Sequence, residues 1–151
     1  MVDTKIGVNF SEVTLNDVEE IISLCNECFN ENTSLEYAKE SFLLTQNDGN
    51  DIYLKGVFDG KIIAHSKITI IHTMYEKMNT YAILNHVCVK PEYRRCGVAT
   101  KMLDEITKIC LKKGVKTLEL WSNNVRVAAH ACYKNYGFHL DDAGFFSKKI
   151  G

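Results

Sequence analysis

The sequence predicts one mixed α/β domain, with a central sheet of about seven strands and about four flanking helices. Its 151 residues suit a single compact domain that buries a core without disulfides or metals. Segments with the two-residue period of strands alternate with segments of helical period. Residues 80–121 have the pattern of strand, helix and strand that is typical of a right-handed crossover between parallel strands. No repeat or linker divides the chain, so residues 1–151 are expected to form one domain.

The composition is that of an ordinary globular protein, with 46% hydrophobic and 25% charged residues. Eighteen basic and nineteen acidic side chains give a net charge of -1, which argues against a nucleic-acid binder. No apolar run reaches the roughly 18 residues of a membrane span, and the N-terminus lacks the pattern of a secretory signal. We therefore expect a cytoplasmic protein that binds neither nucleic acid nor membranes.

The first half of the chain is expected to form one strand, two helices and a hairpin. Hydrophobic residues recur at helical spacing after Thr14, and Asp17 three positions later is typical of a capping box. Asp59-Gly60 tolerates the positive backbone angles of a two-residue turn, which predicts the hairpin. The expected elements are a strand at 6–10, helices at 14–29 and 34–46, a turn at 47–50, and strands at 52–58 and 61–72.

The second half is expected to place a long helix between two parallel strands. Val87, Cys88 and Val89 make their strand apolar on both faces, as a strand buried on both sides should be. Pro91 ends that strand, and Gly114 follows the long helix as a C-terminal glycine commonly does. The expected elements are strands at 80–89, 116–121, 137–138 and 145–150, and helices at 97–113 and 125–136.

The six cysteines include one C-x-x-C pair, Cys25 and Cys28. This pair lies inside a helical pattern, and no second pair completes a tetrahedral site. The sequence therefore favours reduced cysteines that pack as small hydrophobic residues, with no metal site and no redox chemistry.

The segment from Pro91 to Thr100 joins a buried strand to the start of a helix. The first turn of a helix has unpaired N–H groups and partial positive charge. Gly97 allows an anion to approach the backbone, and Arg94 and Arg95 add positive charge. The residues alone leave two interpretations open, a pyrophosphate site or an ordinary helix start with solvated arginines. Neither G-x-x-x-x-G-K-[ST] nor G-x-G-x-x-G is present.

Two blocks of the sequence resemble motifs of one family. Residues 87–99, VCVKPEYRRCGVA, resemble the V-x-V-x-P-x-Y-R-x-x-G-x-[GA] signature of the GNAT N-acetyltransferase superfamily. Residues 126–138, RVAAHACYKNYGF, resemble that family's R-x-x-A-H-x-x-Y-x-x-x-G-F helix, in the family's order. The resemblance extends over nearly all 151 residues. It implies a GNAT-like fold whose fourth and fifth strands are parallel and part near their ends.

The resemblance also implies acetyl-CoA as co-substrate. The pantetheine arm would lie in the gap between the parting strands, and the pyrophosphate would bind the N–H groups that follow Arg94. The residues implied to bind coenzyme A are Val87, Cys88, Val89, Arg94, Arg95, Cys96, Gly97, Val98, Ala99, Thr100, Arg126, Ala129 and Tyr133.

The resemblance assigns Tyr133 as the general acid. A tyrosine hydroxyl, with a reference pKa of about 10, can donate a proton to the departing coenzyme A thiolate. The alternative is that Tyr133 only packs its ring against the sheet and hydrogen-bonds a backbone group.

The general base is left open. Many family members have a glutamate at the position of Asn85, and an amide cannot accept a proton in the relevant pH range. His86 is the neighbouring candidate, because imidazole titrates near neutral pH. A histidine hydrogen-bonded within the sheet and a base role for solvent water are the alternatives. A bulge near Asn85 and His86 would direct the thioester toward the substrate cleft.

The expected activity is acetyl transfer to a primary amine of a small molecule or protein, by direct attack in a ternary complex. An acyl-CoA-binding sensor without efficient turnover is the alternative, because Asn85 replaces the usual glutamate. A nucleic-acid-binding domain built on Arg94 and Arg95 is a third hypothesis, which the balanced charge disfavours. The acceptor is unidentified and a homodimer stays open. Acidic residues that would attract a cationic amine, or form an ordinary solvated surface, are Glu27, Glu31, Glu36 and Glu76.

Overall fold

The computed structural model describes residues 5–151, which divide into two compact units, residues 5–121 and 122–151. The expectation that residues 1–151 form one domain stays a prediction.

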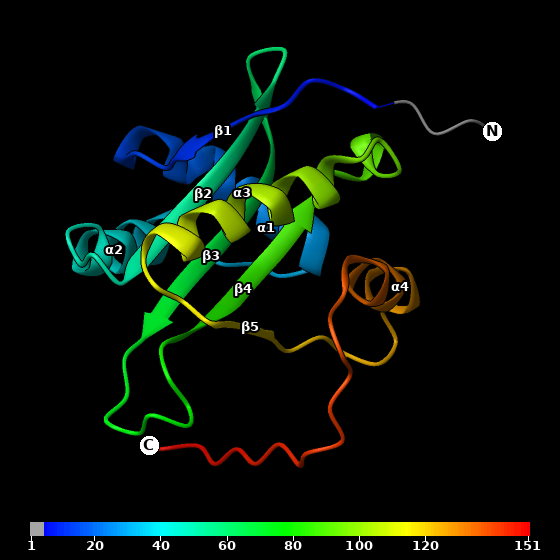
Figure 1. Cartoon of the computed structure of the whole chain (residues 1–151). Coiled ribbons are helices and arrows are strands. Elements are labelled where there is room, and N and C mark those ends of the chain that lie inside the picture. Colours follow the sequence, from blue (N-terminus) through cyan, green and yellow to red (C-terminus); the bar gives the residue numbers. More distant parts are fainter. Residues whose placement is uncertain (1–4) are drawn as a thin grey trace. The chain divides into compact units, whose positions relative to one another are not determined.

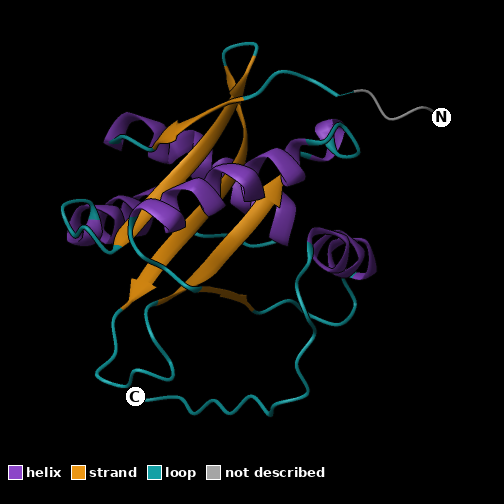
Figure 2. Ribbon diagram, in the orientation of Figure 1, coloured by secondary structure: helices purple, strands orange, loops and turns teal. Residues whose placement is uncertain are grey.

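The first unit contains a five-stranded sheet in the order β1-β2-β3-β4-β5 (Figures 1 and 2). Neighbouring strands are antiparallel except for β4 and β5, which are parallel as expected. The mixed fold class is therefore confirmed. The strands are β1 (Asn9–Glu12), β2 (Asp51–Phe58), β3 (Lys61–Ile71), β4 (Tyr81–Val89) and β5 (Thr117–Leu120).

Helices cover both faces of this sheet. Figure 1 shows α3 in front of the strands, with α1 and α2 behind them. The side chains of Ile63, Leu84, Met102 and Ile106 are fully buried in the core. The helices of the first unit are α1 (Val18–Phe29), α2 (Leu35–Thr45) and α3 (Val98–Lys112), with short 3₁₀ turns at Leu15–Asp17 and Pro91–Tyr93. The second unit contains α4 (Val127–Tyr136).

The local signals of the sequence have the expected structural effect. The Asp17 carboxylate accepts the Thr14 N–H at 2.8 Å, which is the capping interaction expected before α1. Asp59 and Gly60 have φ of 51° and 73°, so the turn between β2 and β3 has the predicted left-handed backbone. The first strand starts later than expected, because its pairing with β2 begins at Asn9 opposite Val57.

The prediction of about seven strands is wrong for the last two. No strand follows Leu120 within residues 121–151. Residues 137–138 instead close α4, because Gly137 has φ 112° and the Phe138 N–H donates to the Tyr133 carbonyl at 2.9 Å. In the expected strand at 145–150, the side chains of Phe146 and Ile150 are 94% and 89% exposed. These apolar side chains are not buried against a neighbouring strand.

Candidate functional site

Strand β4 continues past the end of its parallel partner. The ladder between β4 and β5 runs from Tyr81 opposite Thr117 to Leu84 opposite Leu120, whereas β4 extends to Val89. The two strands part at this point, as Figure 1 shows. The parting that was expected of the fourth and fifth strands is therefore present.

The backbone of β4 presents hydrogen-bonding groups along this open edge. Lys90 donates its N–H to the Ile63 carbonyl at 2.7 Å, and Cys88 lies opposite His65 on β3. Because hydrogen-bonded pairs alternate along an antiparallel ladder, the Val87 carbonyl and the Val89 N–H point away from β3. No residue in the described part of the chain hydrogen-bonds to either group. Cys88 directs its main-chain groups to β3 and buries its side chain, so it lies behind this edge.

The end of the open edge is held by a side chain from the following loop. Arg94 donates its Nε–H to the Val89 carbonyl at 3.0 Å, and the Cys28 thiol lies 3.5 Å from the same oxygen. This contact holds the Nε of Arg94 beside the strand. Because Arg94 is exposed, the rest of its guanidinium still faces solvent.

A bulge interrupts β4 where the sequence predicts one. Between the pairs of Cys88 with His65 and of Asn85 with Lys67, two residues of β4 oppose the single residue Ser66 of β3. His86 has φ 54°, a left-handed conformation that is uncommon for a residue with a side chain.

The side chain of His86 is exposed. It contacts the Phe29 ring edge-on, with 5.5 Å between the ring centroids. Its imidazole forms no hydrogen bond with another described residue. The interpretation of His86 as a histidine hydrogen-bonded within the sheet therefore does not fit the structure.

A second histidine, His65, lies behind the bulge, and the sequence analysis did not single it out. It is 5% exposed, and its Nδ1 lies 2.8 Å from the Leu54 carbonyl oxygen. Burial lowers the pKa of His65 to about 4, against a smaller opposing effect of that hydrogen bond. His65 is therefore neutral near pH 7 and part of the sheet's interior.

The loop between β4 and α3 leaves its main-chain donors available. Arg95 and Gly97 both have left-handed backbones, with φ of 65° and 77°. The first main-chain hydrogen bond of α3 runs from the Lys101 N–H to the Gly97 carbonyl at 3.1 Å. The N–H groups of residues 97–100 donate to no acceptor among the described residues. Unpaired donors at a helix N-terminus form a site for an anion.

Two lysines flank this loop that the sequence analysis missed. The Ile6 N–H donates to the Cys96 carbonyl at 3.4 Å, and the Lys101 ammonium donates to the Ile6 carbonyl at 3.2 Å. The Lys5 side chain passes beside Gly97, where an added Cβ would lie 3.4 Å from its Cγ. No local pattern indicates these contacts, because residues 6 and 101 are 95 positions apart.

In the second unit, the predicted site residues share one face of α4. Arg126, Ala129 and Tyr133 are three and four positions apart, which aligns them along a helix. Tyr133 is half-buried, and its ring lies 5.8 Å from that of Phe138. His130 Nε2 lies 3.2 Å from the Ser122 carbonyl oxygen. This contact holds the loop before α4 against the helix.

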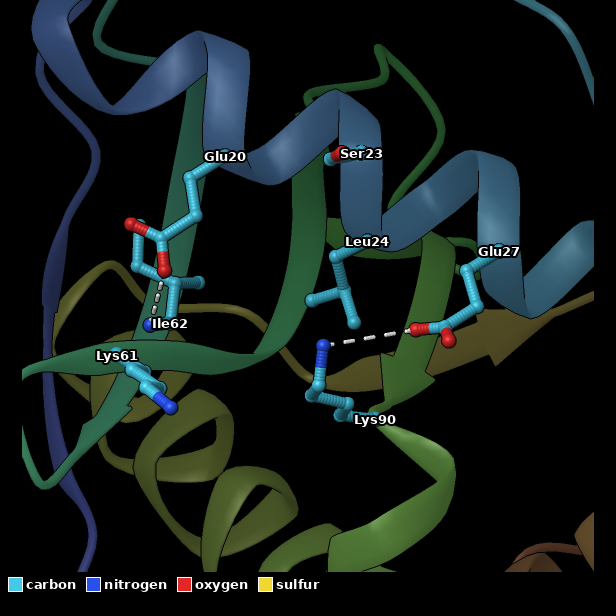
Figure 3. A pocket seen from close by; sticks show the side chains of 7 residues that line it. All are labelled: Glu20, Ser23, Leu24, Glu27, Lys61, Ile62 and Lys90. Atoms are coloured by element: carbon cyan, nitrogen blue, oxygen red, sulfur yellow. Dashed lines mark hydrogen bonds and ion pairs between the residues drawn. The ribbon is translucent and has the colours of Figure 1, made fainter.

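A hollow of about 360 Å³ lies between α1 and the neighbouring ends of β3 and β4 (Figure 3). The Glu20 carboxylate accepts the Ile62 N–H at 2.8 Å. Glu27 lies 3.7 Å from the Lys90 ammonium. Because the carboxylates in this hollow already have partners, Glu27 is less suited to attract an amine than the sequence alone indicates. The lining residues are Glu20, Ser23, Leu24, Glu27, Lys61, Ile62 and Lys90.

The described residues contain neither a metal-binding cluster nor a membrane-spanning helix. Within residues 5–151, no three His, Cys, Asp or Glu side chains are grouped so that they could hold a metal ion. No helix in that range is long and apolar enough to cross a membrane.

Comparison with protein families decides the identity of the chain at the family level. Residues 15–138 match the model of the acetyltransferase (GNAT) family. The chain belongs to this family. The match includes the open edge of β4, the loop before α3 and the helix of Tyr133. No curated protein matches this GNAT chain by sequence.

Solved structures share the GNAT fold at low sequence identity. A transcriptional regulator from Bacillus halodurans C-125 has a TM-score of 0.86 and 15% identity, over 95% of this chain and 100% of that one. An aminoglycoside antibiotic 6′-N-acetyltransferase from Acinetobacter baumannii has a TM-score of 0.79 and 19% identity, over 96% of this chain and 100% of that one. A predicted acetyltransferase from Clostridium acetobutylicum, solved with acetyl-CoA, has a TM-score of 0.78 and 18% identity, over 94% of this chain and 96% of that one. These similarities show a shared fold.

Proposed function

We propose that this protein transfers the acetyl group of acetyl-CoA to a primary amine. The observation that carries the proposal is one arrangement within the first unit. An unpaired strand edge at residues 87–89 leads directly to a loop whose N–H groups at 97–100 are unpaired. An extended amide-containing chain that ends in a diphosphate is complementary to both parts.

Two parts of coenzyme A, the pantetheine arm and the diphosphate, have complementary groups in this chain. The Val87 carbonyl and Val89 N–H would bind the amides of the pantetheine arm as an added strand would. The N–H groups after Cys96 and the positive end of α3 would bind the diphosphate. Gly97 lets the diphosphate approach the backbone, and Arg94 and Lys101 lie close enough to add positive charge. Acetyl-CoA would supply the activated acetyl group as a thioester.

The bulge in β4 would place the acceptor amine beside the thioester. Asn85 would contact substrate in the cleft but cannot take its proton. His86 is exposed at the bulge without a hydrogen-bond partner in the described chain, so its imidazole is available to accept the proton directly or through water. Tyr133 would donate a proton to the departing thiolate, a role that rests on the motif around it in α4.

The acceptor class is a primary amine that carries positive charge in solution. Glu31, Glu36 and Glu76 are exposed and would attract such an amine. A cytoplasmic location, a homodimer and the absence of nucleic-acid and membrane partners stay predictions.

A coupled assay tests the proposal. Purified protein is mixed with acetyl-CoA and a panel of amines that includes a lysine peptide, a peptide N-terminus, a polyamine and an aminoglycoside. We expect the release of coenzyme A thiol to depend on at least one acceptor. Binding of acetyl-CoA without acceptor-dependent release would instead support the sensor function, which Asn85 at the usual base position favours.

A further inference from the structure

The segment before β1 runs beside the loop that precedes α3. The Ile6 N–H donates to the Cys96 carbonyl at 3.4 Å, and the Lys101 ammonium donates to the Ile6 carbonyl at 3.2 Å. Figure 1 shows this segment, in dark blue, passing the start of α3. One contact is to the loop and the other to the first turn of the helix, so residues 5–6 border the proposed diphosphate site.

Two lysines give this border positive charge. Lys5 and Lys101 are both exposed, and the first turn of α3 contains no acidic residue. The Lys5 side chain lies against Gly97, because an added Cβ there would be 3.4 Å from its Cγ and 3.9 Å from its Cδ. Within residues 5–151, neither ammonium forms an ion pair with a carboxylate. Both charges are therefore available to an anion at the loop.

Coenzyme A carries a third phosphate, on the 3′ oxygen of its ribose. Its diphosphate joins the pantetheine arm to that ribose, so the arm and the 3′-phosphate lie at opposite ends of the diphosphate. As a monoester, the 3′-phosphate carries about 1.5 to 2 negative charges near pH 7. The main-chain donors at residues 97–100 are assigned to the diphosphate, so the 3′-phosphate needs other positive groups.

The arrangement of the sheet separates Lys5 from the pantetheine arm. The arm would come from residues 87–89 and pass Arg94, whose Nε–H contacts the Val89 carbonyl. The segment of Lys5 comes instead from β1, which β2 and β3 separate from β4. Arg94 and Lys5 therefore flank the loop from different strands, and Arg94 is on the side of the pantetheine arm. This leaves Lys5 and Lys101 for the ribose end.

We propose that Lys5 and Lys101 bind the 3′-phosphate of coenzyme A and make the site selective for coenzyme A over 3′-dephospho-coenzyme A. The inference rests on the proposed function, because it takes the position of the diphosphate from it. The Lys101 ammonium has three donors, so it can hold the Ile6 carbonyl, and with it the segment of Lys5, and still bind a phosphate oxygen. Hydrogen bonds between an ammonium and a phosphate are stronger than those between neutral groups.

Calorimetric titration of two ligands into the full chain tests the selectivity. Coenzyme A and 3′-dephospho-coenzyme A differ only in the 3′-phosphate, and their binding needs neither an acceptor nor turnover. We expect coenzyme A to bind at least about tenfold more tightly at about 50 mM sodium chloride. The ratio of the two dissociation constants should fall at about 500 mM, because salt screens exposed charges.

Substitutions of the two lysines assign the effect. Lys5→Gln should lower the ratio at least about threefold and leave the affinity for 3′-dephospho-coenzyme A within about twofold, whereas Lys5→Arg should keep the ratio. Lys101→Gln should also lower the ratio, because it removes a charge and the hydrogen bond to the Ile6 carbonyl. Lys108→Gln is the matched control, since Lys108 is exposed on the same helix but pairs with Glu105 at 3.2 Å. It should keep the ratio of the unmodified protein.

The outcomes separate this inference from the proposed function. Equal affinities of the unmodified protein for both ligands, or an unchanged ratio in Lys5→Gln, would overturn the role of the lysines while coenzyme A binding still stands. A fall in the ratio for Lys108→Gln as large as that for Lys5→Gln would show an effect of net charge alone and would overturn that role too. Binding of neither ligand would overturn the inference together with the proposed function.

Discussion

At the scale of single residues, His65 has a titration that the fold changes strongly. Its ring is buried in β3, contacts the Leu54 carbonyl and stacks on Tyr53 with 6.5 Å between centroids. Charging this ring would place a cation in the sheet interior. A positive charge on the exposed His86 would disfavour it further.

The stability of the protein should therefore depend on pH through His65. Its pKa is about 4 when folded, against about 6.5 when unfolded, so the unfolded chain binds the additional proton between these values. The free energy of unfolding is highest above pH 6.5 and should fall by roughly 3 kcal/mol as pH falls toward 4. Urea titrations across this range should show a much flatter dependence for His65→Gln. The exposed control His139→Gln should keep the unmodified slope, and an equal slope for His65→Gln would contradict the account.

Tyr133 makes a prediction about turnover. If its hydroxyl donates a proton to the leaving thiolate, Tyr133→Phe should lower kcat by at least about tenfold and change the KM for acetyl-CoA little. Tyr136→Phe is the matched control, since Tyr136 lies on the same helix and also packs near Phe138, at 6.3 Å. Steady-state kinetics of both variants and of the unmodified protein measure these changes. A kcat for Tyr133→Phe equal to that of the unmodified protein would show that Tyr133 only packs its ring and donates no proton.

At the scale of elements, the sequence predicts best where the determining interaction is local. The capping box of the 3₁₀ turn that leads into α1 depends on Thr14 and Asp17, three residues apart, and both the pattern and the contact are present. The turn at Asp59-Gly60 is equally local. Residues 145–150 show the opposite case, because a strand needs a hydrogen-bonded neighbour and the residue types of a short segment do not supply one.

The capping box before α1 should contribute measurably to stability. The Asp17 carboxylate accepts the Thr14 N–H and lies 2.6 Å from the Lys55 ammonium. Burial opposes ionisation, but these hydrogen bonds outweigh it and hold the pKa of Asp17 below its usual value. Asp17→Asn should lower the free energy of unfolding by about 1 kcal/mol at pH 7.

This loss should shrink as pH falls, because the contribution of a carboxylate with a lowered pKa disappears when it is protonated. Glu19→Gln is the control, because Glu19 is an exposed acidic residue two positions further on, in the first turn of α1. Urea denaturation at pH 7 and at acidic pH provides both values. A loss for Asp17→Asn no larger than that for Glu19→Gln would show that the cap is dispensable.

At the scale of the whole molecule, the features that distinguish the site join distant parts of the chain. The family motif indicates the loop at 91–100 and the parting of the two parallel strands. It does not indicate that residues 5–6 run beside Gly97, or that Cys28 of α1 contacts the end of β4. These contacts depend on tertiary packing, which the spacing of residues within a local segment of the sequence does not indicate.

The most direct test of the account is calorimetric titration of acetyl-CoA into the unmodified protein, Gly97→Ala and Gly97→Glu. Both variants place a side chain at φ 77°, where the nearest contact is the flexible Lys5 side chain at 3.4 Å, so they share the same backbone strain. Only glutamate adds negative charge to the proposed diphosphate site. We predict that Gly97→Ala still binds, while Gly97→Glu, folded by circular dichroism, loses at least about 100-fold in affinity. Unchanged affinity in Gly97→Glu would contradict the proposal that these N–H groups bind coenzyme A.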